Sequence, residues 1–158
     1  MVNINFICHG NICRSTMAES VMTHLINING VAGYFNITSS ATSREEIGNP
    51  PHRGTVDILK QHKVKLVPHR AVQITKEDAS EADILIVMDQ NNVYNLKKLI
   101  YKEGFSKIRL LLSYANLDRS ISDPWYTGNF KQTYEDVLIG CKALLKELMN
   151  DFDCSHNN

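Results

Sequence analysis

Residues 2–25 read VNINFICHGNICRSTMAESVMTHL and contain three different patterns in succession. The first six residues are largely apolar and predict a short buried strand at 2–7. From Met17 onward apolar residues recur at helical spacing, so a helix is expected to begin there or one turn earlier. Between the two lies CHGNICRS, a short loop that contains two cysteines, one glycine and one arginine. A buried strand, a loop and a helix in this order are typical of the first unit of an α/β sheet.

Further along the chain, apolar segments of strand length alternate with segments of helical spacing. Strands are expected at 34–40, 83–89 and 108–113. Helices are expected at 51–62, 76–82, 90–102 and 130–149. This alternation predicts an α/β fold with a doubly wound, four-stranded parallel sheet and helices on both faces. Ligands of such sheets bind beyond the carboxyl ends of the strands, so the loop after the first strand is the expected site.

Length and composition indicate one globular domain spanning residues 1–158, with the polar tail from about 151 to 158 expected to fray. Seventeen basic residues balance seventeen acidic ones, so no overall positive field favours nucleic acid or a membrane surface as a partner. The N-terminus does not resemble a secretory signal, and no apolar run reaches transmembrane length. Four cysteines are too few for a disulfide framework, which favours a reducing, cytoplasmic location.

The loop CHGNICRS combines several features of a phosphate-binding site. Because it leads into a helix N-terminus, backbone N–H groups without helical partners point toward one place, and the helix dipole favours an anion there. Gly10 allows close approach of the backbone, Asn11 tolerates a left-handed conformation, and the guanidinium of Arg14 matches two phosphate oxygens. Helix N-termini and nearby cations lower the pKa of a cysteine thiol from ~8.5 to about 3.5–7.5. The loop therefore predicts a nucleophilic thiolate held against a bound phosphoryl group.

Two other interpretations of the cysteines are disfavoured. A zinc site needs a second pair of ligands at suitable spacing, which the sequence lacks. A structural disulfide is not expected in a reducing compartment. From the residues alone, Cys13 is either a redox-active thiol or a packing residue.

The same loop resembles the signature of the low-molecular-weight protein tyrosine phosphatases, which reads Cys-x-Gly-Asn-x-Cys-Arg-Ser. Further similarity lies in ITSSATS after the second expected strand, HRAVQITKED at 69–78, VMD at 87–89 and DPWY at 123–126, so the resemblance covers nearly the whole chain. It implies an enzyme of the low-molecular-weight acid phosphatase type that needs no cofactor and no metal. The implied reaction is hydrolysis of phosphotyrosine in proteins, and of small aryl phosphates, through a cysteinyl-phosphate intermediate.

The resemblance also implies roles for single residues. Cys8 would be the nucleophile, Arg14 would clamp the transition state, and Ser15 would stabilise the sulfur as a leaving group. Asn11 would hold the loop in shape, and Cys13 would pair with an oxidised Cys8. The residues expected to bind phosphate are His9, Gly10, Asn11, Ile12, Cys13, Arg14 and Ser15.

A second part of the expected site follows the last strand. A phenolate departs faster when a carboxylic acid protonates it, and Asp123 is expected at the same sheet edge as Cys8, stiffened by Pro124. Without the cysteine loop, Ser-Asp-Pro would be only a turn signal. Trp125 and Tyr126 suit a slot for a flat phenyl ring. The residues expected to form the wall around the substrate are His9, Ile12, Glu45, Trp125 and Tyr126.

Three residues match family positions that brace the loop from behind, namely Ser39, His69 and Asp89. For each of them a purely structural role is the alternative; Asp89, for example, also suits a cap of the following helix.

Other positions depart from the familiar family pattern. His9 stands where a leucine is frequent, and Glu45 stands where an aromatic residue or another wall residue is common. Thr16 replaces a frequent proline, and Thr127 resembles an insertion after the aromatic pair. A histidine and a carboxylate at the rim are expected to alter the choice of peptide, or to weaken binding of acidic ones.

Two alternative functions share these features. A thiol-dependent arsenate reductase of the same fold would need further cysteines to relay a disulfide, and none lies between Cys13 and Cys141. A non-catalytic phosphotyrosine-binding module would need neither the sulfur of Cys8 nor the acid of Asp123. The expected partners are therefore phosphotyrosine-containing proteins or small aryl phosphates, bound by a monomer.

Overall fold

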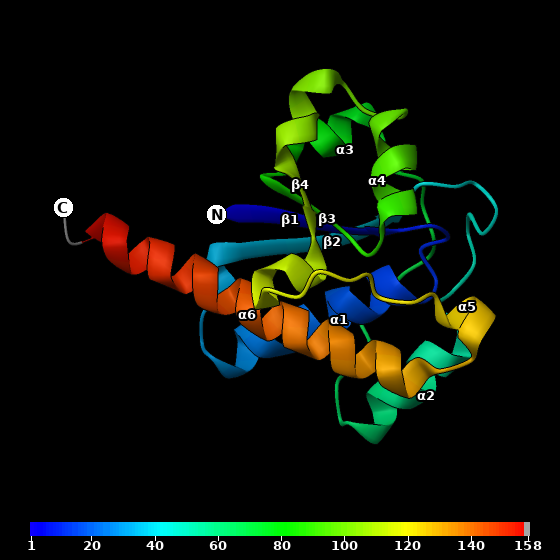
Figure 1. Cartoon of the computed structure of the whole chain (residues 1–158). Helices are drawn as coiled ribbons and strands as arrows, with labels where there is room; N and C mark the ends of the chain where they lie inside the picture. The colour runs from blue at the N-terminus through cyan, green and yellow to red at the C-terminus, as the bar shows by residue number, and fades with distance from the viewer. Residues whose placement is uncertain (157–158) are drawn as a thin grey trace.

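A four-stranded parallel sheet forms the centre of the computed structural model, which describes residues 1–156 (Figure 1). Its strands are β1 (Val2–Cys8), β2 (Phe35–Ala41), β3 (Ile84–Val87) and β4 (Ile108–Leu110). They lie in the order β2-β1-β3-β4, and each pair of neighbours is parallel. The predicted doubly wound, four-stranded parallel sheet is therefore confirmed.

The alternation of side chains along β1 explains why helices cover both faces of the sheet. Ile4, Phe6 and Cys8 join a core with the buried faces of three helices, whereas Ile7 packs on the opposite face. The first face carries α1 (Arg14–Ile28), α2 (Arg53–Gln61) and α6 (Phe130–His156). The second face carries α3 (Lys76–Glu81) and α4 (Gln90–Lys97) (Figure 1).

The loop between β1 and α1 lies where the strand order reverses. From β1 the chain passes through α1 to β2 on one side, and it later returns to β3 on the other side of β1. The backbone N–H of Ile121 donates to the carbonyl of Met88 at 3.0 Å, which brings the segment before α5 (Pro124–Thr127) to the same edge. Three distant parts of the chain thus meet at the switch point, where sheets of this kind bind ligands.

Two expected elements end at least three residues earlier than predicted. The strand expected at 108–113 stops at Leu110, because the next residues turn into a 3₁₀ helix, η3 (Leu111–Ala115), and bury Leu111 and Leu112. A Cβ atom placed on Gly140 of α6 would lie 2.5 Å from Cγ of Leu111, so this packing is close. The helix expected at 90–102 stops at Lys97 and is followed by η2 (Lys102–Lys107). A further 3₁₀ helix, η1 (Ala32–Tyr34), precedes β2.

The last helix is longer than the sequence predicts. It continues to His156, whereas the sequence predicted an end at residue 149 and a tail that frays from about residue 151; residues 157–158 lie outside the described part. The reason is tertiary packing: the ring of Phe152 lies 5.5 Å from that of Tyr34 and 5.9 Å from that of Phe35. These contacts bind the end of the helix to the beginning of β2.

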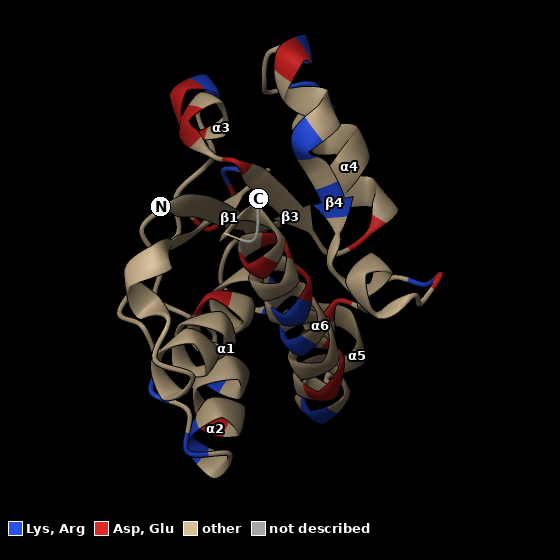
Figure 2. Cartoon of the chain, turned by 90° about the vertical axis from the view of Figure 1, so that its left-hand side faces the viewer, with Lys and Arg blue, Asp and Glu red and all other residues tan. Residues whose placement is uncertain are grey.

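Charged residues of both signs are interspersed over the outer helices, in agreement with a formal net charge of zero (Figure 2). No helix within residues 1–156 has both the length and the apolar character that crossing a membrane requires.

Candidate active site

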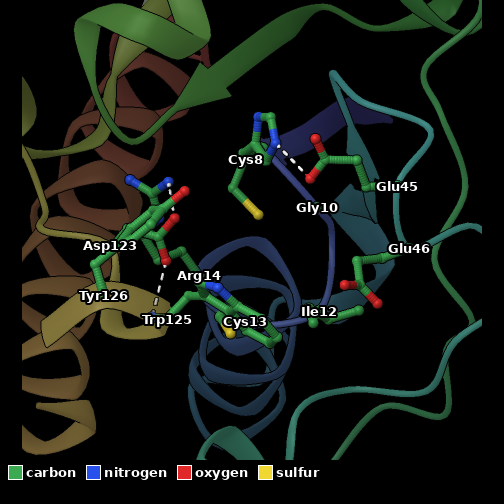
Figure 3. Close-up of a pocket in the computed structure, with 11 residues that line it drawn as sticks. Cys8, Gly10, Ile12, Cys13, Arg14, Glu45, Glu46, Asp123, Trp125 and Tyr126 are labelled. Carbon is green, nitrogen blue, oxygen red and sulfur yellow. Dashed lines mark hydrogen bonds and ion pairs between the residues drawn. The ribbon is translucent and has the colours of Figure 1, made fainter. Parts of the chain in front are cut away.

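A pocket opens at the carboxyl end of β1 (Figure 3). The loop from Cys8 to Arg14 forms its floor, Glu45 and Glu46 form one wall, and Asp123, Trp125 and Tyr126 form the opposite wall. These residues come from three separate connections of the sheet, each of which reaches the same edge.

The sulfur of Cys8 is buried in this floor and takes part in two hydrogen bonds. The backbone N–H of Asn11 lies 3.3 Å from Sγ, and the hydroxyl of Ser15 lies 3.1 Å from it. Helix α1 begins at Arg14, and no side chain in the described part of the protein caps its first turn. The free N–H groups and the helix dipole therefore remain available to an anion at this end.

Asn11 holds the loop in an otherwise unfavourable conformation. Its φ is +60°, which residues other than glycine seldom adopt. The side-chain amide donates to Ser15 at 2.8 Å and to Ser39 at 3.0 Å. Its oxygen accepts from the backbone N–H of Val72 at 3.1 Å and contacts Nε2 of His69 at 2.5 Å. All the hydrogen-bonding capacity of the amide is used, and the loop shape is fixed as a result.

Arg14 is 2% exposed and is held by groups from two distant segments. Nη1 donates to Oδ2 of Asp89 at 2.6 Å and to the carbonyl of Ile121 at 3.0 Å, and Nη2 lies 3.3 Å from Oδ2 of Asp123. Burial alone would lower the pKa of Arg14, but the charge of Cys8 and the hydrogen bond and charge of Asp89 outweigh it and raise that pKa. Nε has no hydrogen-bond partner among the described residues, although it is buried. A buried donor of this kind at the floor of a pocket is suited to an anionic ligand.

Asp123 lies across the pocket from the acidic wall, at the start of the short helix α5. Its Oδ1 accepts from the backbone N–H of Trp125 at 3.1 Å, while Oδ2 faces Arg14. Pro124 occupies the first position of this helix, where its fixed φ is favourable. One carboxylate oxygen therefore orients the side chain, and the other is directed toward Arg14 at the floor of the pocket.

The aromatic wall is exposed but braced. Trp125 is 56% exposed, and its ring makes an edge contact with His52 at 5.8 Å between centroids. His52 also stacks on Phe130 at 5.0 Å, and its backbone N–H donates to the carbonyl of Ile12 at 2.7 Å. Trp125 is thus connected to the loop through His52, which the sequence did not single out. Tyr126 is 82% exposed and forms the outer part of the same wall.

Cys13 also lines the pocket, and all four cysteines are free. Burial, together with the negative charges of Cys8 and Asp123, raises the pKa of Cys13 to about 12, although Arg14 opposes this. Cys13 is therefore a buried thiol that stays protonated near neutral pH.

Behind the loop, Ser39 and His69 form a buried polar cluster with Glu19, which the sequence analysis missed. The hydroxyl of Ser39 lies 3.3 Å from Oε1 of Glu19 and 3.4 Å from Nε2 of His69, and Nδ1 of His69 lies 3.8 Å from Glu19. Burial raises the pKa of Glu19 to about 7, and burial lowers the pKa of His69. The signal in the sequence was an acidic residue, Glu19, inside a segment of helical spacing. In the structure, every position of this segment from 14 to 22 is buried.

The structure places the expected site residues in two layers. Asn11 and Ser15, expected to bind phosphate, are buried beneath the floor, as is Ser39, whereas His69 and Asp89 are partly exposed; none of these five lines the pocket. Glu46 lines the pocket although the sequence analysis did not name it, because an exposed loop carries no periodic signal. Thr127 ends helix α5, just before Gly128. Within residues 1–156, no three His, Cys, Asp or Glu side chains are grouped in a way that would hold a metal ion.

Comparison with known proteins gives a consistent result. Residues 3–153 match the family described as low molecular weight phosphotyrosine protein phosphatase. The chain is 33% identical over 153 residues to the low molecular weight protein-tyrosine-phosphatase YfkJ of Bacillus subtilis, covering 96% of this chain and 98% of that protein. It is 37% identical over 155 residues to PtpA of Staphylococcus haemolyticus, covering 96% of each.

Solved structures agree with this similarity. The crystal structure of Bacillus subtilis YfkJ superposes with a TM-score of 0.91 at 34% identity, over 96% of each chain. The low molecular weight protein tyrosine phosphatase SP-PTP of Streptococcus pyogenes superposes with a TM-score of 0.85 at 38% identity, over the full length of both chains.

Proposed function

Because this chain belongs to the low molecular weight phosphotyrosine protein phosphatase family, we propose that its pocket hydrolyses phosphotyrosine in proteins, and small aryl phosphates, with Cys8 as the nucleophile. The observation that supports this most directly is the shared pocket of Cys8, Arg14 and Asp123. It contains a sulfur, a buried guanidinium whose Nε has no hydrogen-bond partner within residues 1–156, and a carboxyl group.

In the first step the thiolate of Cys8 attacks phosphorus. An S–P bond forms, and the bond between phosphorus and the aryl oxygen breaks. Asp123, in its acid form, gives its proton to the departing phenolate, so that tyrosine leaves as a neutral phenol. The free Nε of Arg14 and the N–H groups at the start of α1 stabilise the negative charge on the equatorial oxygens.

In the second step water replaces the sulfur. Asp123, now a carboxylate, takes a proton from water, and the water oxygen attacks phosphorus as the S–P bond breaks. The hydroxyl of Ser15, 3.1 Å from Sγ, donates to the sulfur and stabilises the thiolate that leaves. The products are inorganic phosphate and the enzyme in its starting state. Both steps use protein groups alone, so EDTA is expected to leave the rate unchanged.

Cys13 is proposed to protect the nucleophile from oxidation. If peroxide converts Cys8 to a sulfenic acid, the sulfur of Cys13 attacks that sulfur while its proton passes to the departing hydroxyl group, and a disulfide and water are formed. A thiol then reduces the disulfide. After peroxide treatment, dithiothreitol is expected to restore most activity to the wild-type protein and little to Cys13→Ser; equal recovery would leave Cys13 as a packing residue.

The arsenate reductase alternative is not favoured. Its disulfide relay needs accessible cysteines near the pocket, but Cys141 is fully buried on α6 and Cys154 lies near the far end of the same helix. The relatives reported above bear the name of phosphatases. The non-catalytic module is not favoured either, because a binding pocket has no need of Cys8 and Asp123 together.

A reducing, cytoplasmic setting is part of the proposal, because four free thiols, one of them a nucleophile, persist best there. A monomer is proposed as the working unit, because one chain supplies both walls and the floor of the pocket.

Hydrolysis of para-nitrophenyl phosphate under mildly acidic, reducing conditions tests the proposed function. Cys8→Ser is expected to abolish turnover while phosphate still binds, because a serine hydroxyl remains protonated there. Cys154→Ser, which changes an exposed cysteine far from the pocket, is the matched control and is expected to keep full activity. Substantial turnover by Cys8→Ser would show that another group is the nucleophile.

A further inference from the structure

The two ends of the pocket differ in charge: the floor has groups that bind an anion, whereas the rim carries carboxylates. At the floor, Arg14 presents a buried Nε without a partner among the described residues. At the mouth, Glu45 and Glu46 face Trp125 and Tyr126 across the opening (Figure 3). A phosphate needs no negative charge at the mouth, so the two carboxylates point to a second feature of the ligand.

Both carboxylates are held in place. Nε2 of His9 lies 3.0 Å from Oε2 of Glu45. The amide of Asn49 donates to Oε2 of Glu46 at 2.6 Å, and the stem of Glu46 packs over the floor, since a Cβ on Gly10 would lie 3.3 Å from its Cγ. Each rim carboxylate therefore has a hydrogen-bond partner beside the pocket, and the stem of Glu46 also packs on the floor.

The charge at the rim is not balanced within the described part of the protein. None of the lysines or arginines found in ion pairs there contacts Glu45 or Glu46. Asn49 is neutral, and His9 compensates Glu45 only when its ring is protonated. Arg44 is exposed and does not line the pocket. Glu46 thus remains an uncompensated anion beside the bound ligand.

We propose that Glu45 and Glu46 form a subsite for a cation, so that the enzyme prefers phosphotyrosine with a lysine or arginine directly beside it in the peptide. This inference rests on the proposed function. The phosphate enters between the loop and Asp123, the phenyl ring lies against Trp125, and the neighbouring basic side chain reaches the opposite rim. A glutamate at that peptide position meets two like charges instead.

The expected size of the effect follows from the exposure of the rim. Ion pairs at exposed positions change an equilibrium by about twofold to fivefold each. Two carboxylates that attract lysine and repel glutamate should therefore give a preference of about tenfold in kcat/KM for the lysine peptide. The preference is expected to shrink as salt is raised, because exposed charges are screened.

The test uses phosphotyrosine pentapeptides that differ only in the residue before or after phosphotyrosine, with lysine, alanine or glutamate at that position. Glu45→Gln and Glu46→Gln are each expected to reduce the lysine-to-glutamate ratio of kcat/KM by about twofold to fivefold, and the double variant to reduce it to about one. Glu103→Gln, an exposed carboxylate on η2, is the control and is expected to keep the wild-type ratio.

The outcomes separate this inference from the proposed function. If para-nitrophenyl phosphate and all peptides are hydrolysed but lysine and glutamate peptides react equally fast, the cation subsite is wrong and the phosphatase activity stands. A ratio unchanged in the double variant would also overturn the subsite. If no substrate is hydrolysed, the proposed function itself fails.

Discussion

Nη1 of Arg14 lies 2.6 Å from Oδ2 of Asp89, so the loop after β1 is joined to the residue that begins α4. Asp89 uses its other oxygen to accept from the backbone N–H of Asn92 at 2.8 Å. The same carboxylate therefore caps a helix and orients the guanidinium. Because Arg14 is almost fully buried, this partner decides whether the guanidinium faces the pocket as a fixed charge.

Asp89→Asn separates these two roles, because an asparagine still caps a helix but carries no charge. We expect kcat/KM for para-nitrophenyl phosphate to fall by at least about tenfold, and the affinity for inorganic phosphate to fall with it. Asp78→Asn, at the third position of α3, where the carboxylate accepts from the backbone N–H of Thr75 at 2.9 Å, is the control for loss of charge in a capping box. If the two variants lose the same stability and neither loses activity, Asp89 serves only as a cap.

Asp123→Asn is expected to retain the hydrogen bond to the N–H of Trp125 but to lose the proton donor. The loss in kcat/KM should be about 10²–10⁴-fold for phenyl phosphate, whose leaving group is poor, and much smaller for a strongly acidic phenol. Steady-state rates for a series of substituted phenyl phosphates measure this. An equal loss across the series would mean that Asp123 positions the substrate and transfers no proton.

Asn11 combines a positive φ with four hydrogen-bond contacts, and two variants distinguish these contributions. Asn11→Gly keeps the backbone conformation accessible, whereas Asn11→Ala adds about 1 kcal/mol of strain. We expect both to lose activity by about tenfold or more, and the alanine variant to be the less stable by urea unfolding.

A control for the backbone effect is Lys63, which has a φ of +56° on an exposed turn. Lys63→Gly is expected to stabilise the protein by about 0.5–1 kcal/mol without changing activity. Full activity in Asn11→Gly would contradict the view that its side chain shapes the loop.

The raised pKa of Glu19 predicts that the free energy of unfolding depends on pH. Burial raises its pKa to about 7, whereas an unfolded glutamate has a pKa of ~4.3. Between these values the folded protein binds more protons than the unfolded chain, so the contribution of this carboxyl is complete below about pH 4 and is lost as the pH rises to about 7. Glu19→Gln imitates the protonated acid. Relative to wild type, the variant should gain about 2–3 kcal/mol of unfolding free energy between about pH 5 and pH 8.

Urea unfolding of both proteins across this range measures the difference. The lowered pKa of His69 gives an opposite slope, which is present in both proteins and largely cancels in the comparison. The opposite result is that the unfolding free energy of the wild type rises relative to that of Glu19→Gln as the pH rises. It would show that Glu19 is ionised and paired with a protonated His69.

Cys13 is expected to resist alkylation. Its pKa of about 12 leaves it protonated in neutral solution, and only the thiolate reacts with iodoacetamide. In a Cys154→Ser background, which removes the exposed thiol, peptide mapping after brief treatment near neutral pH should find the label on Cys8 and not on Cys13. Labelling of Cys13 at a comparable rate would contradict its burial and the effect of its negative neighbours.

The repeating patterns of the sequence were sufficient to predict the α/β architecture and to identify the chemical groups at the floor of the pocket. Strand and helix periods depend on neighbouring residues, and β1, the loop and α1 are continuous in the chain, so Cys8, Gly10, Asn11 and Arg14 are already ordered by local geometry. The Asp-Pro-aromatic segment carries its own local signal, because Asp123 caps the helix that Pro124 begins.

Contacts between distant segments were decided only by the tertiary structure. Arg14 and Asp89 are 75 residues apart, and Arg14 and Asp123 are 109 apart. No period in the chain reports that Glu46 packs over Gly10, that Glu19 is buried behind Asn11, or that Phe152 extends α6 by packing on Tyr34. The free energy of such contacts depends on desolvation and on the geometry of groups that meet only after folding, whereas periodicity records which side of one element faces the core.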